Sequence, residues 1–326
     1  MEPVFPVPLW AWVGFLAFII GVLALDLLVF TREGHQVSLR EAAAWSAVWV
    51  GLAAAFAAVV AVWMGGAKSL EFITGYVVEW SLSVDNLFVF LVIFSYFRVP
   101  PEARHRVLFY GILGAIVMRG LFIAGGIALL NLFHWIIYVF GAFLILTGFR
   151  LAFQSDEHIE PEKNPVLRLA RRFLPVTPAY EESRFIVRTA TGRRVATPLL
   201  LVLLVVESTD VVFAVDSVPA ILAITRDPFI VYTSNIFAVL GLRALFFLIA
   251  GVLEYFRYLR YGLSAVLVFV GLKMLAADVY KFPPALSLAV ISTLLGLSIA
   301  ASIVSVRLEA RQAAARPADG EAPAKE

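Results

Sequence analysis

The sequence of 326 residues contains no cysteine. Its absence excludes a disulfide framework, a thiolate metal site and a cysteine nucleophile. Charged residues are also scarce, at 15% of the chain against about 25% in an average soluble domain. Hydrophobic residues make up 61%, and the mean hydropathy is +0.90. This composition predicts an all-α protein that crosses a membrane several times, and we expect no nucleic-acid partner.

The apolar residues fall into nine runs, and about 20 such residues suffice to cross a bilayer as a helix. We therefore predict nine transmembrane helices, at residues 9–30, 42–64, 69–97, 107–130, 132–152, 198–224, 229–256, 261–277 and 284–306. The first five occupy 1–152 and the last four 198–306. Between them, the polar segment 153–197 predicts a cytoplasmic loop with a small hairpin around Gly192. The tail 307–326 is rich in alanine, proline and charge, which predicts disorder.

Lysine and arginine are divided unevenly among the connections between these helices. One alternating set of connections carries 20 of the 26 basic residues, and the other set carries only Lys68, Arg226 and Lys281. Basic residues concentrate in loops that stay cytoplasmic. The pattern therefore predicts a multi-pass protein of the plasma membrane, with its N-terminus outside and its C-terminus in the cytoplasm.

The third and sixth predicted helices share a pattern: an acid, five residues, an aspartate and a small polar residue. An arginine in the next helix and a glycine in the helix after that repeat in the same order. The matched positions are Glu79 with Asp210, Asp85 with Asp216, Asn86 with Ser217, Arg119 with Arg243, and Gly148 with Gly271. Each unit has three crossings, so the units 69–152 and 198–277 must be inverted relative to each other. Inverted repeats with binding sites near the midplane are typical of secondary transporters.

Acidic residues are out of place in these apolar helices, where each costs roughly 3 kcal/mol on insertion scales. Five acids lie within the third and sixth helices, at Glu79, Asp85, Glu207, Asp210 and Asp216. Arg119 and Arg243 are the cations available to pair with them. Buried salt bridges that only fix helix packing would leave three acids unpaired. The surplus predicts bound cations or bound protons.

Oxygen ligands from carboxylates, amides and hydroxyls suit hard cations such as Mn²⁺, Mg²⁺ and Ca²⁺. The four histidines lie in loops or at helix ends, which disfavours zinc or copper. Besides the five acids we predict Asn86 as a ligand, with support from Ser83, Ser217, Asn235, Arg119, Arg243 and Asp26. Asp85 and Asp216 point away from the faces that carry Glu79 and Asp210. Either the helices unwind near 81–83 and 209–214, or these two aspartates serve different neighbours.

The segments EWSLSVDNLFVF at 79–90 and ESTDVVFAVDSVPAI at 207–221 resemble the signature stretches of the TerC family of integral membrane proteins. TSNIFAVLGLRALFF at 233–247 and ALDLLVF at 24–30 resemble further family stretches. The resemblance implies a link to tellurium resistance by name and to Mn²⁺ export by function. It also implies the functional positions Glu79, Asp85, Asn86, Glu207, Asp210 and Asp216, with Asp26, Asn235 and Arg243 less strongly.

The leading hypothesis is a secondary transporter that exports Mn²⁺, with returning protons as the coupling ion. Transport of Mg²⁺, Ca²⁺ or protons stays open, as do the oligomeric state and the direction of transport. An ATP-driven mechanism is disfavoured, because the sequence has no phosphate-binding glycine-rich loop with its lysine. The alternative is a membrane scaffold of a stress-resistance complex that docks partners through 153–197. Paired aspartates also occur in intramembrane hydrolases, but nothing else here supports that class, and we expect no enzyme.

Overall fold

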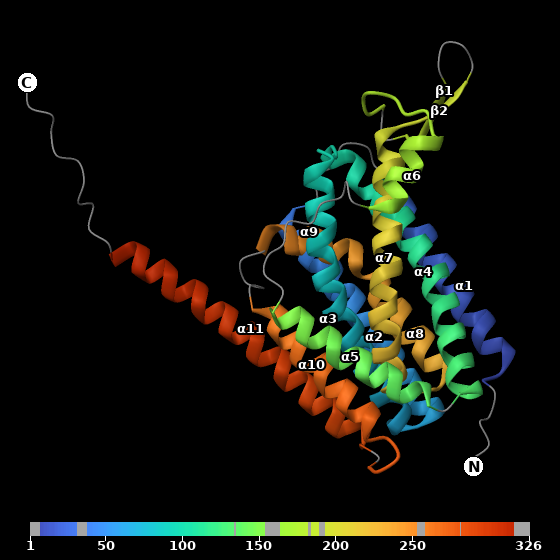
Figure 1. Ribbon diagram of the computed structural model, residues 1–326, viewed down its shortest axis with the longest axis vertical. Helices are drawn as coiled ribbons and strands as arrows, with labels where there is room; N and C mark the ends of the chain where they lie inside the picture. The colour runs from blue at the N-terminus through green and yellow to red at the C-terminus, as the bar shows by residue number, and fades with distance from the viewer. Residues whose placement is uncertain are drawn as a thin grey trace, which may run out of the picture.

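The computed structural model describes residues 7–30, 38–133, 135–153, 164–181, 184–188, 193–252, 258–280 and 282–315. Within its helices, the side chains of residues 26–30, 85, 251–252 and 310–315 are not described. The chain forms a helical bundle with a small hairpin at one end, and the helix that begins nearest the N-terminus starts at the opposite end (Figure 1).

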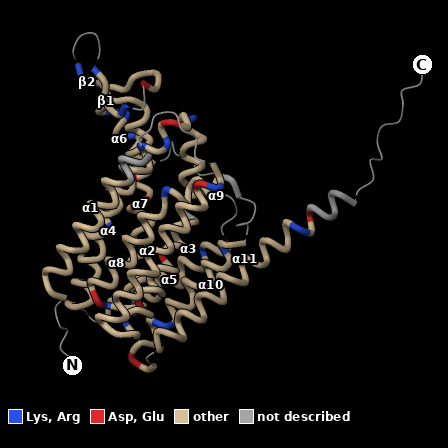
Figure 2. Tube along the Cα trace, turned by 180° about the vertical axis from the view of Figure 1, so that it is seen from behind, with Lys and Arg blue, Asp and Glu red and all other residues tan. Residues whose placement is uncertain are grey.

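Eleven helices and two strands make up the described part of the chain. In order they are α1 (Leu9–Phe30), α2 (Leu39–Met64), α3 (Gly66–Tyr96), α4 (Pro101–Leu132), α5 (Ile136–Phe153), α6 (Pro165–Phe173), β1 (Ile186–Arg188), β2 (Arg194–Ala196), α7 (Pro198–Leu222), α8 (Pro228–Leu240), α9 (Leu242–Val252), α10 (Leu259–Leu275) and α11 (Pro284–Ala315). Charged residues gather at the two ends of the bundle, and long uncharged stretches lie between them (Figure 2).

Six of the described helices are long and apolar enough to cross a membrane: α2, α3, α4, α5, α7 and α11. The pair α8 and α9 passes the same test as one span bent by 41°. The apolar part of α1, Leu9–Leu25, and the 17 residues of α10 are shorter. The structure thus confirms an all-α protein with several candidate spans. Each of the nine predicted ranges overlaps a helix or the bent pair, but nine crossings stay a prediction.

Local sequence explains where several helices begin. Proline occupies the first position of α4, α6, α7 and α8, where its missing N–H costs no hydrogen bond. Asp227 caps α8, because its Oδ1 accepts hydrogen bonds from the backbone N–H groups of Phe229 (3.1 Å) and Ile230 (3.4 Å). Gly65, with φ +93°, is the single residue between α2 and α3. Its left-handed backbone allows the reversal that packs these helices together.

The interior of the bundle is built around α3. Of its apolar window, 65% is buried, against 22–39% for the other five spans, so α3 is surrounded by helices rather than by lipid. It packs against α2, α7, α8 and α11. α4 packs chiefly against α7, and α5 packs most extensively against α10. Residues that α3, α4, α7 and α8 direct inward therefore meet in one place.

Two sequence-based expectations are corrected here. α3 and α7 are continuous helices, so the predicted unwinding near 81–83 and 209–214 is wrong; the break falls instead at Gly241, between α8 and α9. A glycine is a common site for such a kink. α11 continues to Ala315, so residues 307–315 are helical and the predicted disorder there is wrong; 316–326 lie outside the described residues.

The predicted hairpin is present. β1 and β2 pair antiparallel with Val187 opposite Val195, and the turn around Gly192 lies outside the described residues. An additional helix, α6, precedes the hairpin and packs against α7.

Candidate ion-binding site

The centre of the bundle holds a charged cluster built around Arg119 of α4, whose side chain is fully buried. The guanidinium forms an ion pair with Glu79 of α3. It also forms a bidentate pair with Asp210 of α7, because Nη2 lies 3.2 Å from Oδ1 and Nε donates to Oδ2 at 3.3 Å. Glu79 and Asp210 are 1% and 4% exposed. Two acids surround one cation here, so the cluster carries an excess negative charge when both are ionised.

Asn235 of α8 completes the cluster from the fourth side. Its Oδ1 accepts a hydrogen bond from Arg119 Nη1 at 3.4 Å, whereas its buried Nδ2 has no hydrogen-bond partner among the described residues. The structure therefore gives Asn235 a hydrogen bond between helices α4 and α8. The amide still has an unused donor, which a ligand or a rearranged carboxylate would satisfy.

Glu207 lies one helical turn from Asp210 on α7 and is half-buried. Its carboxylate rests against Gly114 of α4, so closely that a Cβ atom at position 114 would collide with both carboxylate oxygens and with Cδ. No described lysine or arginine forms an ion pair with it. Glu207 is therefore a carboxylate near Asp210 that, among the described residues, forms no ion pair of the kind that Glu79 and Asp210 form with Arg119.

Asp216 faces a different part of the bundle. It accepts a hydrogen bond from the Thr147 hydroxyl of α5 at 3.5 Å and interacts electrostatically with Arg150 of the same helix. This agrees with the second sequence-based alternative, that Asp216 serves different neighbours from Asp210. Its predicted counterpart Asp85, and Asp26 of α1, have side chains outside the described residues.

The neutral oxygens near the acids divide into two groups. The hydroxyls of Ser81 and Thr209 donate to the carbonyls of Val77 and Val205, four residues earlier in their own helices. Ser83 of α3 and Ser217 of α7 are buried, and their hydroxyls have no hydrogen-bond partner in the described part of the chain. Unsatisfied buried hydroxyls are uncommon and mark positions where water or an ion is expected. Ser83 and Ser217 are thus the stronger supporting candidates.

The remaining described candidates, Asn86 and Arg243, are also buried. Asn86 lies on α3, two turns beyond Glu79. Arg243 lies at the start of α9, directly after the bend, and has an interaction of its own. Among the described side chains, no three histidines, aspartates or glutamates come together in a group that could hold a metal ion. The physical reason is that Arg119 occupies the space between Glu79 and Asp210, while Asp216 faces α5.

A second polar cluster, which the sequence did not single out, lies at the start of α3. Lys68 Nζ contacts Glu71 Oε2 at 2.9 Å and Asp227 Oδ2 at 3.4 Å. The Thr225 hydroxyl donates to Glu71 Oε2 at 2.5 Å. This network ties the start of α3 to the connection between α7 and α8. Only proximity in space reveals it, because Lys68 and Glu71 are more than 150 residues from Thr225 and Asp227 in the sequence.

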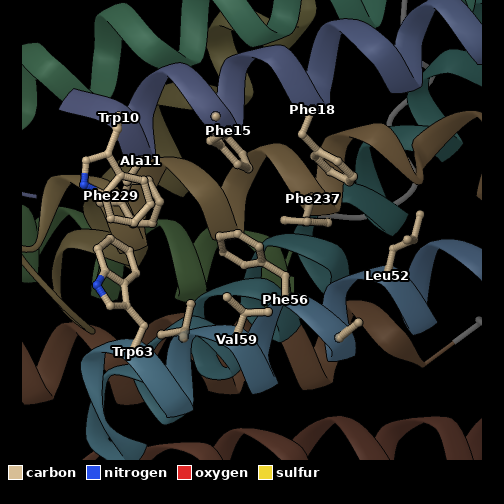
Figure 3. Close-up of a pocket in the computed structure, with 13 residues that line it drawn as sticks. Trp10, Ala11, Phe15, Phe18, Leu52, Phe56, Val59, Trp63, Phe229 and Phe237 are labelled. Carbon is tan, nitrogen blue, oxygen red and sulfur yellow. The ribbon is translucent and has the colours of Figure 1, made fainter. Parts of the chain in front are cut away.

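An apolar pocket of about 550 Å³ lies between α1, α2 and α8. Figure 3 shows its aromatic lining, with Trp10 and Trp63 together at one end and Phe18 and Phe237 towards the other. None of the predicted ion ligands lines it. The pocket is thus unsuited to a cation and is separate from the charged cluster.

The fold and the site together define a class: an all-α integral membrane protein with two carboxylates and an arginine paired inside its bundle. The chain belongs to the Integral membrane protein TerC family, whose sequence profile matches residues 64–312. This confirms the resemblance that the acidic motifs predicted.

Relatives align over nearly the whole chain. The membrane protein STKORF319 of Myxococcus xanthus is 55% identical over 296 residues, covering 91% of this chain and 92% of its own length. Alx of Escherichia coli strain K12, whose name describes a proposed membrane-bound redox modulator, is 48% identical over 291 residues, with 86% and 90% covered. Alx of Salmonella typhi is 47% identical over 299 residues, with 88% and 92% covered. No solved structure matches the chain.

Proposed function

We propose that the protein is a secondary transporter that exports a hard divalent cation, in the first place Mn²⁺, from the cytoplasm. The observation that carries the proposal is the excess of acid at the centre of the bundle. Glu79 and Asp210 share one arginine, and Glu207 lies a helical turn away without a described cation. Such a group of carboxylates is costly in an apolar bundle unless a cation or protons bind there.

The central arginine suggests how the site would cycle. When no ion is bound, Arg119 neutralises Glu79 and Asp210, so the empty site does not stay highly charged. An incoming divalent cation competes with the guanidinium for the same oxygens, and Glu207 supplies a further carboxylate from the adjacent turn. A proton on Glu207 would neutralise it during the return step. Arg119 is thus an internal competitor of the transported ion.

The packing of the helices supports the inverted repeat on which a midplane site depends. In the predicted repeat, α3 corresponds to α7, α4 to the pair α8 and α9, and α5 to α10. If a two-fold axis relates the two units, the contact between α3 and α8 should have a counterpart between α7 and α4. Both contacts are present and extensive. The same axis exchanges α5 with α10, so these two helices should contact each other, as they do. This is the pattern that a two-fold relation between the units produces.

Manganese as the ion and export as the direction come from the family resemblance rather than from the geometry. The name of the Alx relatives suggests a redox role. The 326-residue sequence contains no cysteine, so thiol–disulfide exchange has no residue on which to act. A redox effect that runs through a metal ion would agree with transport of a redox-active cation.

The transport proposal is tested in proteoliposomes that contain a Mn²⁺-sensitive dye. We expect Glu79→Gln, Asp210→Asn, Asp85→Asn and Asp216→Asn each to lower the flux by about tenfold or more, the scale seen when groups that support a metal site are removed. Glu102→Gln, which changes an exposed carboxylate on α4, is the matched control and should transport normally. Equal flux in all variants would refute the assignment of the site.

The contact of the Glu207 carboxylate with Gly114 gives a second prediction. Gly114→Ala places a methyl group where the Glu207 carboxylate now rests, so we expect that carboxylate to be displaced and the flux to fall. Stability should change by no more than about 1 kcal/mol, because the obstructed group is the end of a flexible side chain and alanine favours the helix. Gly125→Ala on the same helix has open space around it and is the control. Equal flux in the two variants would contradict a role for Glu207.

The scaffold alternative predicts a different result. If residues 153–197 dock a partner, replacing the exposed hairpin residues Ile186 and Arg188 with serine should abolish metal resistance in cells. The flux in proteoliposomes would then remain unchanged. Loss in cells without loss in liposomes would favour the scaffold over the transporter.

A further inference from the structure

The short helix α6 has three distinct faces. Leu167 and Ala170 are buried where the helix packs on α7. Val166, Leu169 and Phe173, spaced three and four residues apart, share a second face. Leu169 and Phe173 are 59% and 70% exposed, so nothing in the described chain covers this apolar strip.

The third face of α6 is basic. Arg168, Arg171 and Arg172 are all exposed. At 100° per residue Arg168 and Arg171 point away from the apolar strip. Arg172 lies at the edge of the strip, with its guanidinium carbon 5.9 Å from the centre of the Phe173 ring. A helix with an apolar side, a separate cationic side and no acidic residue among Pro165–Phe173 fits the boundary between lipid chains and headgroups. Arginine side chains there reach to anionic headgroups.

We propose that α6 is a binding site for anionic phospholipid, with Leu169 and Phe173 in the acyl region and the three arginines on the headgroup phosphates. Two observations support lipid rather than a water-exposed loop. The apolar strip is uncovered although the helix packs against α7, and the arginines beside the strip have the charge that anionic lipid requires. The positive-inside pattern places this end of the bundle at the cytoplasmic leaflet.

The docking of α6 connects this surface to the candidate ion site. Asn164 caps the helix, since its Oδ1 accepts from the backbone N–H groups of Val166 (2.9 Å) and Leu167 (3.3 Å). Its Nδ2 donates to the Ser208 hydroxyl at 2.9 Å. Ser208 directly follows Glu207. Lipid bound on α6 would therefore fix the part of α7 that presents Glu207, a consequence that rests on the proposed function.

The lipid site is tested with a single spin label in the cysteine-free full chain. Leu169→Cys carries the label in nanodiscs of phosphatidylcholine with or without phosphatidylglycerol, and accessibility to oxygen and to a nickel chelate reports depth. With phosphatidylglycerol the label should be protected from the chelate and accessible to oxygen. Label at Ile186→Cys, an exposed hairpin position, should report water in both lipids.

Charge is tested in the same chain with Arg171→Gln/Arg172→Gln. We expect each lost arginine to weaken the preference for phosphatidylglycerol about fivefold. Arg188→Gln/Arg194→Gln removes the same charge from paired, exposed hairpin positions and should leave the label depth unchanged. A label at 169 that stays in water, that ignores lipid charge, or that shows dipolar coupling to a second copy would overturn the proposal.

The link to transport is tested separately with Asn164→Ala. This variant should keep the lipid-dependent label depth but lose any increase of Mn²⁺ flux caused by phosphatidylglycerol. If no variant transports Mn²⁺ while the label still responds to lipid charge, the proposed function fails and the lipid site stands.

Discussion

Replacing Arg119 with methionine is expected to destabilise the protein by about 3–5 kcal/mol, the cost of removing one partner from a buried ion pair. Methionine fills most of the space but leaves Glu79 and Asp210 buried without their cation, and it removes the hydrogen bond to Asn235. The measurement is thermal unfolding of purified protein in detergent micelles. Wild-type stability in Arg119→Met without added metal would contradict the structure of the cluster.

Added Mn²⁺ makes this experiment decisive for function. If the carboxylates can hold a divalent cation, Mn²⁺ should raise the Tm of Arg119→Met more than that of the wild type, because the ion no longer competes with the guanidinium. Ligand binding to the folded state stabilises it by about 2.7 kcal/mol at a hundred times Kd. The matched control is the triple variant Arg119→Met/Glu79→Gln/Asp210→Asn. It should regain stability and lose the response to Mn²⁺.

Mg²⁺ should stabilise Arg119→Met less than Mn²⁺ if the site also selects between hard cations. An equal response of the single and triple variants would mean that Mn²⁺ acts elsewhere, and the central cluster would then be only structural. The Tm without metal and the change in Tm with Mn²⁺ therefore distinguish two roles for Arg119. It either only fixes helix packing or also competes with a transported ion.

The sequence was a good guide to the class of protein and to the residues that gather at its centre. Long apolar runs predict helices because the bilayer leaves no other partner for the backbone. Buried charge is equally informative, since Glu79, Asp210 and Arg119 are too costly in lipid to be incidental. Their spacing could not give their pairing: Arg119 forms ion pairs with an acid of its own unit and with an acid of the other.

What the sequence left open depends on contacts between distant segments. Nothing near Glu207 in the chain indicates that Gly114 of another helix makes room for it. Unwinding of the acid-bearing helices was one of two alternatives, but α3 and α7 stay helical, and the chain bends instead at Gly241, between α8 and α9. Side-chain direction on an intact helix is enough to send Asp210 and Asp216 to different neighbours. The predicted ligand set is consequently divided between two regions, and a shared site would require rearrangement.

The interface of α5 with α10 is where such a rearrangement is most constrained. Gly271 of α10 lies so close to α5 that a Cβ atom there would be 2.6 Å from the Gly141 carbonyl oxygen and 3.1 Å from the Ile145 backbone nitrogen. The relation is reciprocal, because a Cβ atom at Gly141 would be 2.9 Å from the Gly271 carbonyl oxygen. The Ser264 hydroxyl adds a hydrogen bond to the Gly148 carbonyl at 2.7 Å. Small residues that let backbones approach are a common basis of helix association in membranes.

Gly271→Leu is therefore expected to destabilise the protein by about 3 kcal/mol or more, since the obstructing atoms are backbone and the two helices must separate to admit the side chain. The measurement is the yield of monodisperse protein and its Tm in detergent. Gly296→Leu is the control, because position 296 of α11 has open space around it, and its Tm should not fall.

Gly141→Leu should cost about as much as Gly271→Leu, and the double variant should cost clearly less than the sum. Both substitutions separate the same pair of backbones, and effects at one contact are not additive. Full additivity would mean that the two glycines act at independent places, which would contradict the reciprocal contact.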